Sequence, residues 1–105
     1  MNNLFNLGVI EVMDLSGMGM MSRIRSSRVR KDHGGRPWRF PSPSEIDYIG
    51  SLKRDYNIAP FVVGYYWSNV AIYETSSICY HLIDGRGQDI KNSSAWAYLM
   101  LVRNL

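Results

Sequence analysis

Cysteine is almost absent from this sequence. Its 105 residues include a single cysteine, Cys79, so no disulfide can form within the chain. A domain of this size without disulfides depends on dense packing of large apolar side chains. Three tryptophans, seven tyrosines and three phenylalanines supply such side chains. We therefore expect one domain over residues 1–105 with an aromatic core.

Long apolar runs and a secretion signal are also missing. The uncharged stretch Ile58–Tyr73 contains Pro60 and Gly64, which is typical of strands and turns and not of a membrane span. The first fifteen residues contain no basic segment and include Glu11 and Asp14, so they do not resemble a signal peptide. The sequence thus predicts neither membrane insertion nor export by the secretory route.

Patterns for catalysis, metal binding and nucleotide binding are missing too. Cys79 and His81 would share one face of a strand, but a zinc site needs further ligands that the pattern does not supply. The segment Asp84–Asp89 lacks the ligand spacing of a calcium loop, and no glycine-rich segment has the spacing of a phosphate loop. We expect Cys79 to be a buried apolar residue, and we expect no enzyme activity, cofactor or metal.

A first helix is predicted from about Met18 to Arg30. Methionines at 18, 20 and 21, followed by Ile24, favour an apolar stripe at helical spacing, although Gly19 weakens the pattern. We interpret these methionines as adaptable core residues.

A second helix is predicted from Pro43 to Tyr56. Ser42 can cap its first turn, Pro43 suits its first position, and Glu45 occupies the position of a capping-box carboxylate. The apolar face of this helix is formed by Ile46, Ile49, Leu52 and Tyr56.

Strands are predicted on both sides of the helices. β-Branched and aromatic residues are concentrated in four segments, which are Leu4–Val12, Phe61–Trp67, Ile78–Ile83 and Ala95–Arg103. The sequence Asp84-Gly85-Arg86-Gly87 is typical of a tight turn between two strands. This order of elements predicts an α+β fold in which two helices pack on a small antiparallel sheet.

Basic charge is concentrated in one block. Residues 23–39 contain seven of the twelve basic side chains and one acid, Asp32. On a helix, Arg23 and Arg30 would share one face, and Arg25 and Arg28 another. This scatter fits a solvated helix as readily as a surface that binds a polyanion or an acidic partner. The candidate contact residues are Arg23, Arg25, Arg28, Arg30, Lys31 and Arg36.

Two blocks of the sequence resemble a bacterial domain family. Trp38-Arg39-Phe40-Pro41-Ser42, followed by Ser44-Glu45-Ile46, is similar to the family's "WRLPT…EL" block, and Gly64-Tyr65-Tyr66-Trp67-Ser68-Asn69 is similar to its "YWSS". A "DG" turn, Asp84-Gly85, and a closing Leu101-Val102-Arg103 follow in the family's order, so the resemblance spans about residues 5–103. The family comprises the Fibrobacter succinogenes major paralogous domain and the C-terminal domain of Legionella collagen-like surface proteins.

The resemblance implies a C-type-lectin-like fold that serves as a binding or assembly module on surfaces. Related folds also form receptor-binding tips of phage fibres, and no catalytic residues carry over. The chain departs from the family where Phe40 replaces a leucine and Asn69 replaces a small hydroxyl residue. The Glu-Pro-Asn and Gln-Pro-Asp motifs of calcium-dependent lectins are absent, so that activity is not expected.

Several residues of these blocks are assigned structural roles. We expect Trp38 and Trp67 to anchor the core. Arg39 and Arg103 are each expected to donate charge-assisted hydrogen bonds to a carbonyl group or an acid. The candidate core and capping residues are Trp38, Trp67, Ser42 and Glu45. The candidate loop contacts are Tyr65, Tyr73 and Tyr80. The tyrosines fit the core as readily as a contact surface, and we expect a mixture of the two.

The sequence as a whole predicts a non-enzymatic binding or assembly module. Because the chain shows no secretion signal, we expect a small phage virion protein, made in the host cytoplasm and associated with the capsid or a fibre. Its expected partners are other protein chains, including further copies of itself, or a surface glycan or host receptor. The alternative is a small cytoplasmic regulator that binds nucleic acid through residues 23–39. Nucleic acid is the less expected partner, since no groove-reading motif accompanies this block.

Overall fold

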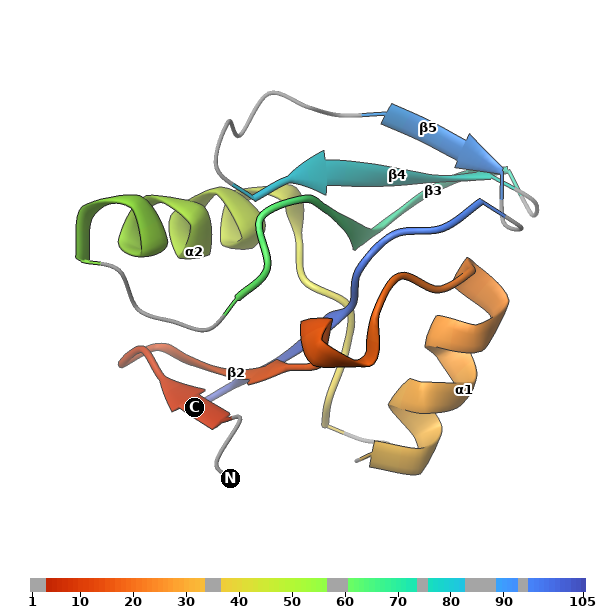
Figure 1. The fold of residues 1–105 in the computed structure, drawn as a ribbon. Helices are drawn as coiled ribbons and strands as arrows, with labels where there is room; N and C mark the ends of the chain where they lie inside the picture. The colour runs from red at the N-terminus through yellow and green to blue at the C-terminus, as the bar shows by residue number, and fades with distance from the viewer. Residues whose placement is uncertain (1–3, 34–36, 57–60, 74–75, 83–88, 93–94) are drawn as a thin grey trace.

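The protein combines two helices with two small antiparallel sheets, so the predicted α+β class is confirmed (Figure 1). The computed structural model describes residues 4–33, 37–56, 61–73, 76–82, 89–92 and 95–105. The elements in chain order are β1 (Leu4–Asn6), β2 (Ile10–Asp14), the 3-10 turn η1 (Ser16–Met18), α1 (Arg23–His33), α2 (Pro43–Tyr56), β3 (Tyr65–Tyr73), β4 (Ser76–His81), β5 (Asp89–Asn92) and β6 (Met100–Asn104).

The first sheet has the order β1-β2-β6 and joins the two ends of the chain. Strands β2 and β6 are antiparallel, with Val12 opposite Val102. The prediction of one strand over Leu4–Val12 is wrong, because the chain turns at Gly8, whose φ is 95°. The Asn6 side chain accepts a hydrogen bond from the Gly8 N–H at 2.8 Å, so an asparagine and a glycine convert one apolar run into a hairpin.

The second sheet has the order β3-β4-β5. Strand β3 begins at Tyr65, four residues later than the pattern predicts, and Phe61 packs in the core ahead of it. Strand β6 likewise occupies only the end of the predicted Ala95–Arg103 segment. The residues before it form isolated bridges instead, which connect the two sheets through backbone hydrogen bonds between Tyr98 and β3. The predicted turn at residues 84–87 lies outside the described residues.

Helix α1 begins five residues later than predicted. Gly19, with a φ of 86°, ends η1, and Met21 then pairs with Ala97 in an isolated bridge. Ser22 caps the helix, since its Oγ accepts a hydrogen bond from the N–H of Arg25 at 3.2 Å. The predicted methionine stripe is therefore not helical: Met21 is buried, whereas the remaining apolar members, Met18, Met20 and Ile24, are exposed.

Helix α2 has the predicted bounds, and its capping box is formed. The Ser42 N–H donates to Glu45 Oε1 at 2.8 Å, and the Glu45 N–H donates to Ser42 Oγ at 3.2 Å. Ile46 and Ile49 are fully buried on its inner face. Leu52 is half-buried, and the side chain of Tyr56 lies outside the description. Of the described members, the two isoleucines are the buried ones.

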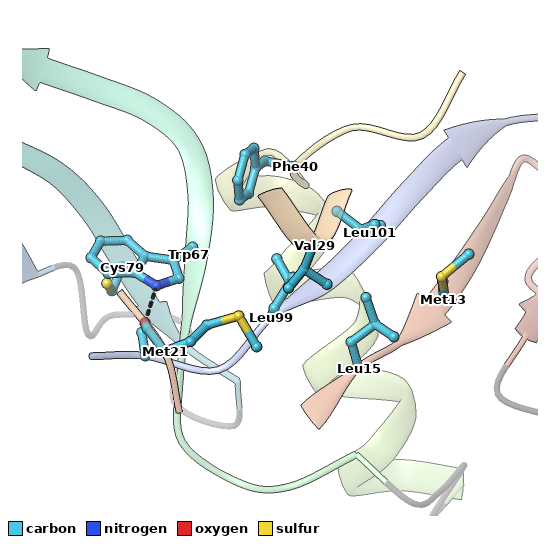
Figure 2. Close-up of a cluster of buried hydrophobic side chains, with 10 residues drawn as sticks. Met13, Leu15, Met21, Val29, Phe40, Trp67, Cys79, Leu99 and Leu101 are labelled. Carbon is cyan, nitrogen blue, oxygen red and sulfur yellow. Dashed lines mark hydrogen bonds between the residues drawn. The ribbon is translucent and has the colours of Figure 1, made fainter. Parts of the chain in front are cut away.

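The first sheet separates two core clusters. Side chains alternate between the faces of a strand, so neighbours such as Val12 and Met13 enter different clusters. The α1-side cluster contains Met13, Leu15, Met21, Val29, Phe40, Trp67, Cys79, Ala97, Leu99 and Leu101 (Figure 2). The α2-side cluster contains Ile10, Val12, Ile46, Ile49, Phe61, Tyr66, Leu82, Met100 and Val102. In the described part of the chain, neither helix has the length and apolar character needed to cross a bilayer.

Candidate functional site

The basic block is divided between two faces of α1. Arg23 and Arg30, seven positions apart, face inward with Ser27 between them, as the helical spacing predicts. The side chains of Arg25, Arg28 and Lys31 are exposed. Arg36 lies outside the described residues. The six predicted contact residues therefore do not form one stripe.

The inward face of α1 borders a cleft of about 340 Å³. We call it the arginine cleft. Its opposite walls come from the segment before α2 and from β3, so residues distant in the sequence meet there. The lining residues are Arg23, Ser27, Arg30, Arg39, Phe40 and Asn69.

Arg23 lines the cleft and packs against two aromatic rings. Its guanidinium carbon lies 3.8 Å from the centroid of the Phe40 ring and 5.8 Å from that of Trp67, which is cation–π geometry. Its Nη1 donates to the Ser68 carbonyl oxygen at 2.6 Å. Desolvation by burial lowers the pKa of Arg23, an effect that the neighbouring Cys79 opposes. The guanidinium nevertheless stays charged.

Arg30 and Arg39 complete the charged wall, but they differ in partners. Arg30 donates from Nη1 to the Trp38 carbonyl oxygen at 3.0 Å. Arg39 binds the carboxylate of Glu45 through two hydrogen bonds of 2.8 Å and also donates to Asn104 at 2.8 Å. The hydrogen bonds between Arg39 and Glu45 raise the pKa of Arg39 and lower that of Glu45. Arg39 is thus neutralised within the protein.

The positive charge available to a ligand therefore comes from Arg23 and Arg30. Among the described residues, neither arginine lies within ion-pair distance of a carboxylate. Each uses Nη1 for a backbone carbonyl. A guanidinium has five N–H donors, so both retain donors for an anion.

Sequence reasoning did not identify two polar residues of the cleft. Ser27 lies between the two arginines at helical spacing, which is a signal that could have identified it. Its Oγ donates to the Arg23 carbonyl oxygen at 3.2 Å. Asn69 has no such signal, because it lies at the cleft through the packing of β3 beside a distant segment, where its N–H donates to the Pro41 carbonyl oxygen at 2.8 Å.

The predicted core and capping residues lie beside the cleft. Trp67 is fully buried, and its Nε1 donates to the Met21 carbonyl oxygen at 2.8 Å (Figure 2). Trp38 is only half-buried; it packs against the α1-side cluster and lies 5.3 Å from the Arg103 guanidinium. Arg103 binds Glu11 at 2.6 Å, the type of charge-assisted bond that was predicted for it.

The predicted tyrosine contacts do not gather into one exposed surface in the described structure. Tyr65 is half-buried against the α1-side cluster, and Tyr80 is half-buried against the α2-side cluster. The side chain of Tyr73 lies outside the description. Tyr66, their neighbour, is fully buried and donates its hydroxyl to the Val62 carbonyl oxygen at 2.6 Å. Burial raises the pKa of this hydroxyl.

The cleft has the chemistry of an anion site. It combines cationic and neutral hydrogen-bond donors with the aromatic ring of Phe40. Within the described ranges, no three histidine, cysteine or acidic side chains form a group that could hold a metal ion. Searches against protein-family models and against curated proteins find no match to this sequence.

Proposed function

We propose that this chain is a non-catalytic binding and assembly domain that recognises an acidic partner protein. The observation that carries the proposal is the distribution of charge on α1. Arg25, Arg28 and Lys31 are exposed on its outer side, while Arg23 and Arg30 line a cleft without a carboxylate partner among the described residues. Such a helix attracts and orients acidic partners.

Exposed apolar residues near the start of α1 favour a protein over a nucleic acid as the partner. Trp96 and Ile24 are 61% and 57% exposed. Trp96 and the exposed Met20 flank the Met21–Ala97 bridge, so they lie close to the first turn of α1. Tryptophan, methionine and arginine are enriched where proteins bind proteins.

The C-type-lectin-like fold belongs to this proposal and rests on the two resembling sequence blocks. Trp67 from the second block lies in the α1-side cluster, and Trp38 from the first packs against that cluster. The two blocks are thus parts of one structural unit, as a shared fold requires. In the form we propose, the domain is a small structural protein of a phage virion, attached to the capsid or a fibre.

The charge proposal is tested by reversing two exposed charges. The variant R25E/R28E is compared with K53E/R54E, which makes the same charge change on α2. Binding of the full chain to fluorescent poly-L-glutamate and to duplex DNA is measured by anisotropy at several salt concentrations. We expect at least a tenfold loss of poly-L-glutamate binding for R25E/R28E only. A different outcome would support the nucleic-acid regulator. In that case the unmodified chain would bind DNA more tightly than poly-L-glutamate, with a steep salt dependence, and R25E/R28E would abolish the DNA binding.

The virion proposal needs a separate measurement. Phage particles purified from lysates of the source organism are analysed by mass spectrometry, with a washed sample as the control for adsorbed protein. We expect the chain to remain with the particles after a high-salt wash. Its absence from all particle fractions of cells that express it would contradict this assignment.

A further inference from the structure

We infer that the arginine cleft binds a carboxylate side chain, supplied by an aspartate or glutamate of the partner protein. This inference rests on the proposed function, because it names the chemical group that the partner inserts. It concerns the inner face of α1, whereas the charge-reversal test above addresses the outer face. The two faces can therefore be tested separately.

Arg23 carries a positive charge that no carboxylate balances among the described residues. Its guanidinium is partly buried against the ring of Phe40, and desolvation opposes its charged state. Removing a charge from water is unfavourable unless an opposite charge or hydrogen bonds replace the water. The Ser68 carbonyl oxygen replaces part of that solvation. An anion in the cleft would replace more of it and would supply the missing negative charge.

Both Arg23 and Arg30 retain hydrogen-bond donors for an anion. Arg23 and Arg30 each use Nη1 to hold a backbone carbonyl. In each guanidinium this leaves the edge formed by Nε and Nη2, whose parallel N–H bonds match the two oxygens of a carboxylate. Among the described residues, no group accepts from either edge. The side chains of Ser27 and Asn69 add neutral polar groups at the same cleft.

Hydrogen bonds within the protein hold the walls of the arginine cleft in place. Arg39 is held by two hydrogen bonds to Glu45 and one to Asn104. Arg30 holds the carbonyl of Trp38, so α1 is fastened to the segment before α2. Because the donors are positioned before a ligand arrives, binding requires less ordering of side chains.

The shape of the cleft favours an acidic side chain over an anionic ligand that stacks on an aromatic ring. The volume of about 340 Å³ is sufficient for one such side chain. Arg23 covers a face of Phe40 at 3.8 Å, so that face is not available to stack a sugar or a base. The planar guanidinium edges suit a planar carboxylate.

The test uses two blocked pentapeptides, one with two glutamates and one with glutamines at the same positions. Calorimetric titration of the full chain should show binding of the glutamate peptide only. The variant R30Q should lose about tenfold in affinity. The variant R30K keeps the positive charge but not the planar guanidinium, so its affinity should lie between those of R30Q and the unmodified chain. R54Q on α2 removes one exposed positive charge outside the cleft and should bind like the unmodified chain.

Several results would overturn the inference. Equal binding of the glutamine peptide, or unchanged affinity in R30Q, would show that the cleft does not hold a carboxylate. Inorganic phosphate or sulfate that binds more tightly than the glutamate peptide would assign the cleft to a different oxyanion. R30K with full affinity would overturn the bidentate geometry. Thermal unfolding of each variant verifies that it is folded. The variant R23K, which keeps the positive charge, repeats the R30K measurement at the second arginine of the cleft.

The same variants separate this inference from the proposed function. If R25E/R28E loses poly-L-glutamate binding while R30Q keeps its affinity for the peptide, the outer face of α1 binds acidic partners and the carboxylate site in the cleft is refuted. If R30Q loses peptide affinity while R25E/R28E behaves like K53E/R54E, the cleft assignment stands and the outer surface does not carry binding.

Discussion

The arginines of the cleft differ in how much of their charge the protein itself balances. Arg39 donates two hydrogen bonds to Glu45, whose Oε1 also accepts from the Ser42 N–H in the capping box of α2. Arg23 and Arg30 bind backbone carbonyl groups and keep their net charge. At the scale of single residues, one arginine therefore stabilises the fold, and the other two combine a structural bond with the capacity to bind an anion.

Replacing Glu45 should make the stability of the protein less dependent on pH. The pKa of Glu45 is lowered below its ordinary value of 4.5, chiefly by the hydrogen bonds from Arg39. The stability that it contributes is therefore present above pH 4.5 and is lost as the pH falls through the lowered pKa. We expect E45Q to be about 1 kcal/mol less stable at neutral pH, because both the cap and a partly exposed ion pair are weakened.

Urea unfolding at neutral and acidic pH measures this effect. The difference between E45Q and the unmodified chain should shrink as the pH falls. D47N, an exposed position on the same helix, serves as the control for loss of one negative charge. A constant difference at all pH values would contradict the assigned role of the ion pair.

Trp67 should contribute more to stability than any exposed aromatic residue. It is fully buried and donates to the Met21 carbonyl oxygen, so W67F removes a hydrogen bond and leaves unfilled volume. We expect a loss of about 2 kcal/mol in the free energy of unfolding. The control W96F, at a position that is 61% exposed, should change it by less than about 0.5 kcal/mol. Circular dichroism in urea measures both, and equal effects would refute this view of the core.

At the scale of elements, the segment before β6 holds the two sheets together. The Trp67 N–H donates to the Tyr98 carbonyl oxygen at 3.1 Å, and the Tyr98 N–H donates to the Tyr65 carbonyl oxygen at 2.9 Å. Gly64, just before β3, lies against the ring of Tyr98. A side chain at this glycine would press on the contact that joins the sheets.

The variant G64A tests this close approach. A Cβ at Gly64 would lie 2.8 Å from Cε2 and 3.0 Å from Cδ2 of Tyr98, so the ring would have to move from its place beside Tyr66. We expect a loss of about 1 to 2 kcal/mol in stability, measured by urea unfolding. G17A is the matched control, because a Cβ there meets no atom within 4 Å. A G64A variant as stable as G17A would show that the ring moves freely.

Local sequence signals predicted the whole of α2, but at α1 they predicted a helix with the wrong start. The start signals of α2, from Ser42 to Glu45, lie within four residues, so no distant contact is needed to interpret them. At α1 the methionines suggested a helical stripe, but Met21 instead pairs with Ala97, which is 76 residues away in the sequence. The sequence around Met21 and the sequence around Ala97 give no local signal of a bridge between them.

At the scale of the whole molecule, the first sheet lies between two apolar clusters that involve both helices. Cys79 lies in the α1-side cluster and is fully buried. A reagent can reach its thiol only when this cluster opens. The reactivity of Cys79 is therefore a measure of how cooperatively the molecule unfolds.

Labelling of Cys79 by a thiol reagent should follow global unfolding. We expect very slow labelling in the absence of urea, and a rate that rises in parallel with the loss of circular dichroism, provided that reclosing is faster than labelling. W67F should label faster, in proportion to its lower stability. Rapid labelling of a chain whose circular dichroism is native would show that the cluster opens locally.

Part of the candidate site was predictable from the sequence. The inward pairing of Arg23 and Arg30 follows from their spacing on a helix, and the bond between Arg103 and an acid was expected. The sequence predicted a charge-assisted bond for Arg39 and a capping role for Glu45, but it did not predict that the two residues pair with each other. The entry of Asn69 into the cleft was unpredictable, since it depends on how β3 packs beside the segment before α2.

The sequence by itself determined the α+β class, the whole of α2 and the concentration of basic charge in residues 23–39, because each depends on residues close together in the chain. Only the tertiary structure decided that Leu4–Val12 is divided between two strands, that a second sheet exists, and that two arginines of the block line a cleft while others face solvent. These features depend on contacts between distant segments, and periodicity or composition within one segment does not record such contacts.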